Sequence, residues 1–314
     1  MQPDPKASPS DTWQRAVAGV WHGLPACFRP DGALLGHLAV ERSILSRPDG
    51  DLEIVVRMSP QEFTDPAWAA RLRFPGDRES FIVRNDGPRR LYLGPDCHGV
   101  GQPFGACTLG HDHQQPWAAQ NQIVVLLHPG GETQTYSNIL RNSLRCELVL
   151  HGLYLHTPAD WADHPELRTK IANHLAHERL AASAPLPPLT TSERWSGHLE
   201  LFTADQRPLG PCPLIHTRTP TSPNYEHSQL ELHGPLPHHF LHTLNHQLEL
   251  SGDLVGSALD LGRARYISAI SRRDGLRLEL LDYRVDADTR TLCWQLHRGL
   301  QLEHVLHGQL KRQP

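Results

Sequence analysis

Short runs of alternating apolar and polar residues recur along the chain. The segment 276–280 reads Leu-Arg-Leu-Glu-Leu, and the segments 51–58 and 122–128 carry β-branched centres. Because successive side chains of a strand point to opposite faces, this period of two predicts half-buried β-strands. Pro-Asp-Gly at 30–32 and 48–50 supplies the residues that tight hairpin turns need. The pattern therefore predicts a mainly antiparallel β protein.

Two parts of the sequence are repeated. The tryptophan-led segments 21–36 and 195–210 align without a gap and share six residues at an offset of 174, as between Trp21 and Trp195. A second match, between 144–152 and 300–308, has an offset of 156, so the first copy holds 18 more residues. Self-similarity of this kind is typical of duplicated units. We therefore expect a tandem duplication of one β-rich unit.

One helix is predicted between the copies. In 165–179 apolar residues recur every four positions, and the proline-rich stretch 181–188 that follows cannot continue a helix. About eight strands in each copy is the size of a closed antiparallel barrel. The expected organisation is a first barrel at 13–156, a helical and proline-rich linker at 157–188, and a second barrel at 189–314.

The opening of the first copy, Gly19-Val-Trp21-His-Gly23, resembles the start of lipocalins and related calycin barrels. With its two-copy layout and proline-rich link, the chain is similar to an uncharacterised cyanobacterial family of two-domain lipocalin-like proteins. The second copy departs from this pattern, because Glu193 stands in place of Gly19. The resemblance implies barrels that bind an apolar or tetrapyrrole-like small molecule. It implies no catalytic residue set.

Charge and composition exclude several partners. The 30 Lys and Arg residues are balanced by 34 Asp and Glu residues, for a net charge of −4. This leaves no basic surface for nucleic acid, and no apolar stretch predicts membrane insertion. The six cysteines never occur as Cys-x-x-Cys, and the N-terminus lacks a secretory signal pattern. We expect reduced thiols and a cytoplasmic protein.

A group of arginines and tyrosines in the second copy is the main candidate ligand site. Arg265, Tyr266, Tyr283 and Arg284 fall on two predicted strands, with Arg263 beside them. Arginine pairs with planar oxyanions through two parallel hydrogen bonds, so the group could clamp a carboxylate. The alternative is a charged outer face of the sheet. We expect the second barrel to bind the ligand, and the first copy's segment 94–116 to act as a loop that covers a site or contacts a partner.

His151 and His307 are candidate ligand contacts because the duplication repeats them. Each follows Val-Leu in the last predicted strand of its copy. A histidine at this place either lines a barrel lumen, where it can contact a ligand or donate a proton, or bonds to the backbone at a strand end. Both alternatives stay open.

Metal-binding patterns are incomplete. Gly105 to His113 opens like the first cupin metal motif, but the required carboxylate is missing and Gln134 stands where the second motif has histidine. His238, His242 and His246 share one face of either a helix or a strand. We predict no metal site and no required cofactor, whereas a bilin, haem or carotenoid-like ligand is what the resemblance implies. The alternatives to binding are an enzyme of the same fold (a chromophore lyase, isomerase or cyclase), a cupin-type metal oxygenase, or a filled structural barrel.

Overall fold

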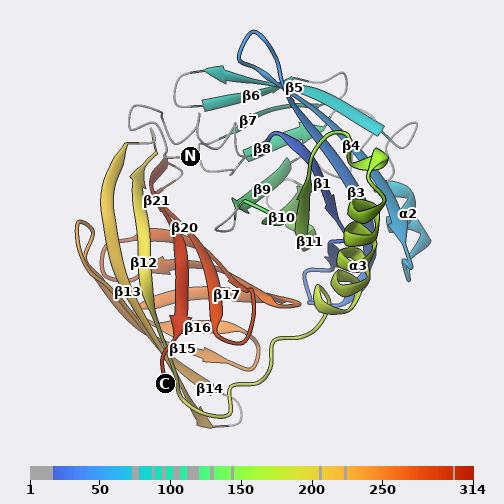
Figure 1. Cartoon of the computed structure of the whole chain (residues 1–314). Helices are drawn as coiled ribbons and strands as arrows, with labels where there is room; N and C mark the ends of the chain where they lie inside the picture. Colours follow the sequence, from blue (N-terminus) through green and yellow to red (C-terminus); the bar gives the residue numbers. More distant parts are fainter. Residues whose placement is uncertain are drawn as a thin grey trace. The chain divides into compact units, whose positions relative to one another are not determined.

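The computed structural model describes residues 17–72, 78–86, 89–93, 97–101, 107–111, 120–127, 131–142, 145–204, 207–222, 225–299 and 301–314. The chain is mainly β and divides into two compact units, Met1–Ala184 and Pro185–Pro314 (Figure 1). The helical elements are α2 (Pro66–Arg71), η3 (Trp161–Asp163) and α3 (Pro165–Ala181). Within the described ranges, no helix has the length and apolar character that a membrane span requires.

The first unit contains one antiparallel sheet of eleven strands. They are β1 (Gly19–Gly23), β2 (Ala26–Phe28), β3 (Leu34–Ser46), β4 (Leu52–Gln61), β5 (Arg78–Asp86), β6 (Arg89–Leu93), β7 (Cys97–Gly101), β8 (Cys107–His111), β9 (Gln120–Leu127), β10 (Thr133–Asn142) and β11 (Arg145–Thr157). Neighbouring strands follow chain order from β3 to β11, and β1 pairs with both β11 and β3. Fully buried Trp21 belongs to the core on one face of this sheet, and its Nε1 donates to the Val17 carbonyl at 2.7 Å.

The segment 94–116, predicted to be a loop, contains strands β7 and β8. These pair with each other, from Cys97 opposite His111 to Gly101 opposite Cys107. The prediction was wrong here because the segment has no alternating apolar pattern. A strand ladder is made by backbone groups, so a glycine-rich segment can join a sheet without that pattern.

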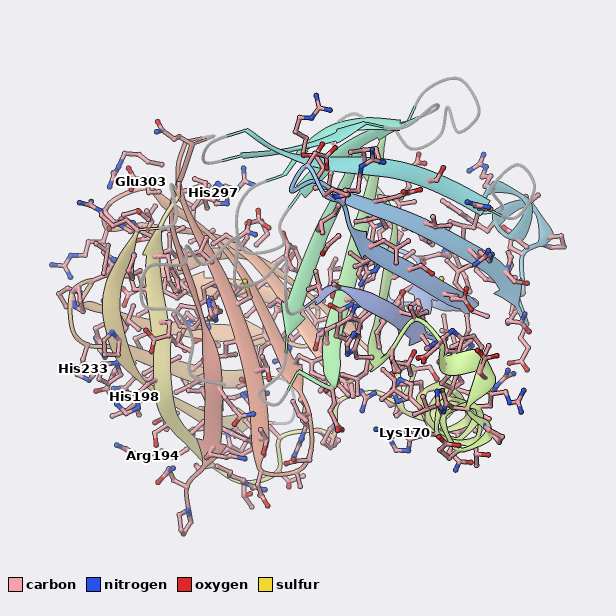
Figure 2. The ribbon with its side chains drawn as sticks, turned by 45° about the horizontal axis from the view of Figure 1, so that its top comes forward. Lys170, Arg194, His198, His233, His297 and Glu303 are labelled. Atoms are coloured by element: carbon pink, nitrogen blue, oxygen red, sulfur yellow. The ribbon has the colours of Figure 1, made fainter. Side chains whose placement is uncertain are left out.

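The second unit is a closed antiparallel barrel of ten strands. They are β12 (Glu193–Thr203), β13 (Pro208–Ser222), β14 (Tyr225–Leu232), β15 (His238–Asn245), β16 (Glu249–Gly252), β17 (Leu254–Leu261), β18 (Ala264–Ser271), β19 (Leu276–Arg284), β20 (Thr289–Arg298) and β21 (Gln301–Arg312). Leucine side chains from alternate positions fill its interior together with Trp195 and Trp294. Arg194, His198 and His233 point outward from the barrel (Figure 2).

The strands beside the two tryptophans have matching registers. Trp21 lies opposite Arg42 on β3, and Trp195 lies opposite His216 on β13. The same offset of 174 relates both members of these pairs. On the other side, Trp21 lies opposite His156, whereas Trp195 lies opposite Arg312, which is the offset of 156 found in the sequence.

The register also shifts at matching positions. A bulge separates Cys27 from Phe28 in the pairing of β2 with β3, and another separates Leu201 from Phe202 in the pairing of β12 with β13. Both members of the pairs again differ by 174. The two sequence matches therefore mark strands that pair in the same way in both units.

Helix α3 packs on the first unit. The buried Glu178 carboxylate accepts a hydrogen bond from the Leu153 amide at 2.9 Å, and His174 Nε2 lies 3.0 Å from the Leu153 carbonyl. The two side chains therefore bond to the main-chain amide and carbonyl of one residue in β11. The helix predicted at 165–179 is thus present, and it covers the outer face of β11.

Replacing Gly308 with alanine should destabilise the second unit. An ideal Cβ at Gly308 would overlap the His198 carbonyl oxygen and lie 3.0 Å from the Leu199 Cα, both backbone atoms of β12. We expect a loss of about 2 kcal/mol in the free energy of unfolding, measured by urea denaturation. Gly275→Ala is the reference, because its Cβ meets open space and the substitution tests only the cost of φ = +70°. An unchanged free energy of unfolding in Gly308→Ala would contradict the close approach of β21 to β12.

Candidate functional site

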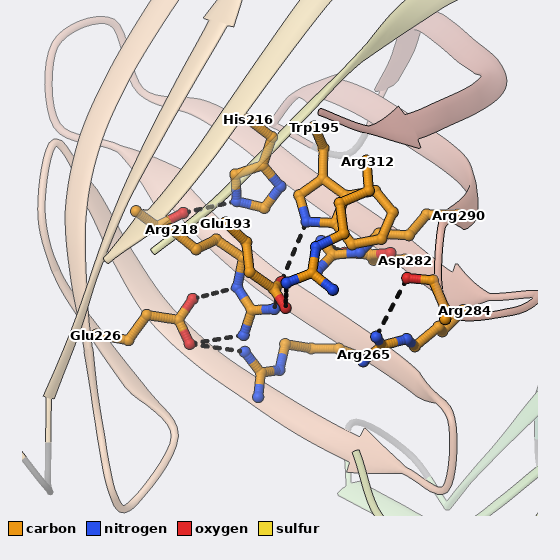
Figure 3. A network of polar contacts seen from close by, with 12 residues as sticks. Glu193, Trp195, His216, Arg218, Glu226, Arg265, Asp282, Arg284, Arg290 and Arg312 are labelled. Atoms are coloured by element: carbon orange, nitrogen blue, oxygen red, sulfur yellow. Dashed lines mark hydrogen bonds and ion pairs between the residues drawn. The ribbon is translucent and has the colours of Figure 1, made fainter. Parts of the chain in front are cut away.

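Polar residues replace leucine at one end of the second barrel's interior. In β13, β18 and β20 the inward positions continue from the core residues Leu214, Ala269 and Leu292 to arginines. These arginines are Arg218, Arg265 and Arg290, and Glu226 of β14 lies among them (Figure 3). The alternation of strand side chains therefore directs charged groups into the barrel.

Two of these arginines make paired hydrogen bonds with carboxylates. Arg218 donates from Nε and Nη2 to the two oxygens of Glu226, at 2.6 and 2.7 Å. Arg265 donates from Nε and Nη2 to both oxygens of Asp260, at 2.6 and 3.0 Å, and its Nη1 lies 3.5 Å from Glu226. This fork geometry fixes both the position and the plane of each guanidinium.

Arg290 is the most deeply buried of the three, with 3% of its surface exposed. Its Nη1 donates to Asp282 at 3.0 Å, and its Nη2 donates to Glu193 at 3.1 Å. Its guanidinium carbon lies 4.0 Å from the ring centroid of Trp195, whose Nε1 donates to Glu193 at 3.1 Å. Residues of β12, β19 and β20 are thereby joined across the barrel.

A cavity of about 40 Å³ lies among these side chains. Its charged lining consists of two carboxylates, Glu226 and Asp282, and five arginines: Arg218, Arg263, Arg265, Arg284 and Arg290. Glu193 and Asp260 pair with three of these arginines, and the resulting four carboxylates are still fewer than the five arginines. Leu186 and Pro187, from the segment that precedes β12, also line the cavity. The site is thus a small, positively charged space.

The charges in the site are set by burial and by neighbouring groups. Burial opposes ionisation of Glu226, but hydrogen bonds and charges from Arg218 and Arg265 outweigh it and hold the pKa below its usual value. Burial lowers the pKa of Arg290, an effect that the Asp282 carboxylate opposes. Arginine begins from so high a pKa that it stays charged at neutral pH. The arginines therefore supply fixed positive charge.

Two histidines complete the lining and are neutral. His216 Nε2 shares a hydrogen bond of 2.9 Å with the Ser228 hydroxyl, and burial, followed by the charges of Arg290 and Arg218, holds its pKa well below 6.5. Burial also lowers the pKa of His242 to about 4, and its Nδ1 makes no hydrogen bond with any described residue. Neutral imidazoles leave the positive charge of the site to the arginines.

Two of the six predicted ligand residues lie at the cavity. Arg265 and Arg284 line it, and Arg284 donates to the main-chain carbonyls of Asp286 and Ala287, both at 3.3 Å. Tyr266 and Tyr283 lie on the same strands but on the opposite face from the core, where both are buried. The structure therefore does not bring the two tyrosines to the cavity.

His151 and His307 alternate with core residues of their own units. His307 alternates with the core residue Leu306, and its ring stacks on Phe202 with the centroids 5.3 Å apart. His151 alternates with the core residue Leu150, and its Nδ1 lies 2.7 Å from the Ser137 hydroxyl. Both histidines thus point to the side of the strand away from the core, where His307 lies against an aromatic ring and His151 against a hydroxyl.

Sequence reasoning missed Arg218, Glu226 and Arg290. Each lies two or four positions from an inward leucine on its own strand, so the period of two that predicted the strands also placed these residues inside. The signal was present, but a polar residue within a strand ordinarily faces water.

The structure shows no cluster of potential metal ligands among the described residues. His242 faces the cavity, whereas His238 lies beside Phe240 at the other end of β15. His113 of the cupin-like motif lies outside the described residues. Gln134, at the place of the second motif's histidine, is buried in β10.

Comparison with known proteins supports the fold and leaves the function open. No protein-family model matches the chain, and no curated protein matches it. It is similar in structure to a protein of unknown function from the DUF3598 family of Nostoc punctiforme, with a TM-score of 0.57, 13% sequence identity, and coverage of 98% of this chain and 100% of that one. A putative outer membrane protein from Bacteroides fragilis gives a TM-score of 0.25 at 8% identity, covering 96% of this chain and 99% of that one. Transferrin binding protein B from Neisseria meningitidis gives 0.22 at 9%, covering 94% and 76%. Only the first similarity is close enough to indicate a shared fold.

The lowered pKa of His242 should make stability depend on pH. Between pH 6.5 and 4.5 the unfolded chain binds a proton at this histidine, whereas the folded state, with a pKa of about 4, largely does not. Stability contributed by the neutral form is thus lost as the pH falls. Over this range the wild type should lose about 2 kcal/mol more unfolding free energy than His242→Gln, measured by urea denaturation. Identical losses in both proteins would contradict the burial of a neutral His242.

Proposed function

We propose that the second barrel binds a small molecule through an anionic oxygen-bearing head group, such as a carboxylate or a phosphate. The observation that carries this proposal is the cavity lining of five arginines and two carboxylates. Guanidinium groups match the geometry of these anions, and attraction between charges is stronger at a buried site than in water. The excess positive charge would be balanced by such a ligand.

The size of the cavity determines which part of the ligand would enter. A cavity that holds one water molecule has a volume of roughly 10–15 Å³ on the same measure. The cavity of about 40 Å³ therefore accommodates a head group but no large ring system. Beneath the cavity, core side chains such as Leu214, Leu230 and Trp294 fill the barrel. A bilin, haem or carotenoid-like ligand would therefore leave its body outside this lumen and insert at most a carboxylate.

The protonation states favour binding over acid–base catalysis. The arginines keep their protons at neutral pH, and a histidine with a pKa of about 4 is not a proton donor there. Neutral His242 can still form a hydrogen bond to a ligand through Nδ1. These groups support recognition of a bound anion without requiring a reaction.

We also propose that both units are copies of one calycin-like barrel, as the repeated sequence suggests. Support comes from the matching registers at Trp21 and Trp195 and from the bulges after Cys27 and Leu201. Divergence then separated the two copies at their inward positions. Gln134 of β10 lies opposite Tyr154, whereas Arg290 of β20, at the offset of 156, lies opposite Leu310.

The proposed anion site is tested most simply at Arg284 and Arg265. Isothermal titration at low ionic strength should detect binding of sulfate, inorganic phosphate or butyrate, and their relative affinities distinguish a phosphate-like from a carboxylate head group. Arg284→Gln, which loses only hydrogen bonds to two carbonyls, and Arg265→Gln should each weaken binding about tenfold or more.

Arg298→Gln is the matched control. Arg298 is exposed and paired with Glu303 at 2.9 Å, away from the cavity lining. The Arg298→Gln variant should bind the three anions with the affinity of the wild type. Wild-type protein that binds none of the three anions, or Arg284 and Arg265 variants that retain full affinity, would contradict the proposal.

The duplication makes a geometric prediction. In an experimental structure, residues 19–44 and 146–157 should superpose on 193–218 and 302–313 in one rigid-body fit, with Trp21 on Trp195 and Gly152 on Gly308. Such a fit follows from shared register and shared bulges. Tryptophans at unlike positions after the fit would contradict a common origin.

A further inference from the structure

The core-facing side of the first unit carries polar groups of its own. Arg42 of β3 alternates with the core residues Val40 and Ile44, so it points to the same side as they do. On β10, Gln134 and Asn138 flank Tyr136, which packs against that core. Arg42 lies opposite Trp21 of β1. Gln134 lies opposite Tyr154 of β11, which in turn lies opposite Gly23 of β1. Arg42, Gln134 and Asn138 form a second polar cluster, separate from the arginine cavity.

The two amides of this cluster are buried, and three of their four polar atoms bond to no described residue. Gln134 is 0% exposed, and neither atom of its side-chain amide hydrogen-bonds to a described residue. Asn138 is 8% exposed, and its Oδ1 likewise has no such bond. A buried polar group without a hydrogen bond costs free energy, and folded proteins contain few. These amide atoms therefore lack the hydrogen bonds that buried polar groups ordinarily make, and no described residue supplies them.

Arg42 is held by aromatic rings instead of a carboxylate. Its guanidinium carbon lies 4.9 Å from the ring centroid of Tyr136 and 5.3 Å from that of Tyr154. Its Nε is buried and unbonded, and no carboxylate of a described residue forms an ion pair with it. A guanidinium over a ring face is attracted by the ring, and its N–H groups can still donate to an anion.

Gly23 allows this arrangement. An ideal Cβ at this position would lie 2.7 Å from ring atoms of Tyr154, so the ring lies directly over the glycine. Tyr154 is thereby placed across β1 and beneath Arg42. By the two sequence offsets, Arg42 and Gln134 take the positions of His216 and Arg290, so polar groups occur at the same register level in both units.

We propose that Arg42, Gln134 and Asn138 form a binding site for a small organic acid. The carboxylate of the ligand pairs with the Arg42 guanidinium and accepts a hydrogen bond from the Gln134 amide. A hydroxyl or N–H group at the other end of the ligand donates to Asn138 Oδ1. Tyr136 and Tyr154 contact its apolar body. This site uses different residues from the arginine cavity and does not depend on the function proposed for that cavity.

Titration calorimetry with 4-hydroxybenzoate tests the site in the full chain. This probe combines a carboxylate, an aromatic ring and a hydroxyl donor. We expect Arg42→Met, which keeps an apolar side chain over the tyrosines, and Gln134→Leu each to weaken binding about tenfold or more. Arg57→Gln is the control within the same unit, because Arg57 is exposed and paired with Glu41 at 2.7 Å, and it should leave the affinity for this probe unchanged.

The Gln134→Leu variant gives a second, independent readout. If the amide is kept for a ligand, leucine removes an unbonded buried polar group of similar size, and the melting temperature of the ligand-free protein should rise by a few degrees. A lower melting temperature would show that the amide serves the fold and would overturn the proposal. Failure of the wild type to bind the probe, or full affinity in Arg42→Met and Gln134→Leu, would overturn it as well. If Arg42→Met still binds sulfate, the second-barrel site is intact, and a loss of 4-hydroxybenzoate binding in this variant is specific to the first unit.

Discussion

The burial of Arg290 is the constraint on which the polar end of the second barrel depends. A guanidinium with 3% exposure is tolerated only because Asp282, Glu193 and the Trp195 ring surround it at once. Removing one partner of such a group leaves an uncompensated charge, at a cost of roughly 3–5 kcal/mol. The partners lie on β12 and β19, while Arg290 lies on β20, so three strands must be in register before the charge is satisfied. The same contacts that close this end of the barrel thus also build its positive cavity.

The proposed function rests on the positive charge that these contacts leave uncompensated. Paired carboxylates fix the arginines in place but do not match them in number, and neutral His216 and His242 neither add nor remove charge. The packed leucine core below prevents a ligand from passing deeper into the barrel. We propose that rigid donors, a low-dielectric surrounding and a small volume together select for a compact anionic group. At the same register level, the first unit has amides and tyrosines near one arginine, Arg42.

The strands, the helix near 165–181 and the repeated anchors could be predicted, because local periodicity and direct residue identity report them. The side of the sheet to which each side chain points could not be predicted. We expected Tyr266 and Tyr283 to contact the ligand beside Arg265. Neighbouring residues of a strand point to opposite sides, so these tyrosines, each next to an arginine of the cavity, point away from it. Arg218 and Arg290 were overlooked because a polar residue within a strand ordinarily faces water. Their burial depends on partners up to 97 positions away, as between Glu193 and Arg290, and no local pattern records such pairs.

The most direct measurement is X-ray diffraction from crystals of the full chain soaked in selenate, collected at the selenium absorption edge. Selenate is an oxyanion that arginine recognises as it does sulfate or phosphate, and its anomalous scattering identifies its position without ambiguity. We expect an anomalous peak in the cavity lined by Leu186 and Pro187, within hydrogen-bonding distance of Arg265 and Arg284. Selenate found only on the outer surface, with the cavity holding water alone, would contradict it.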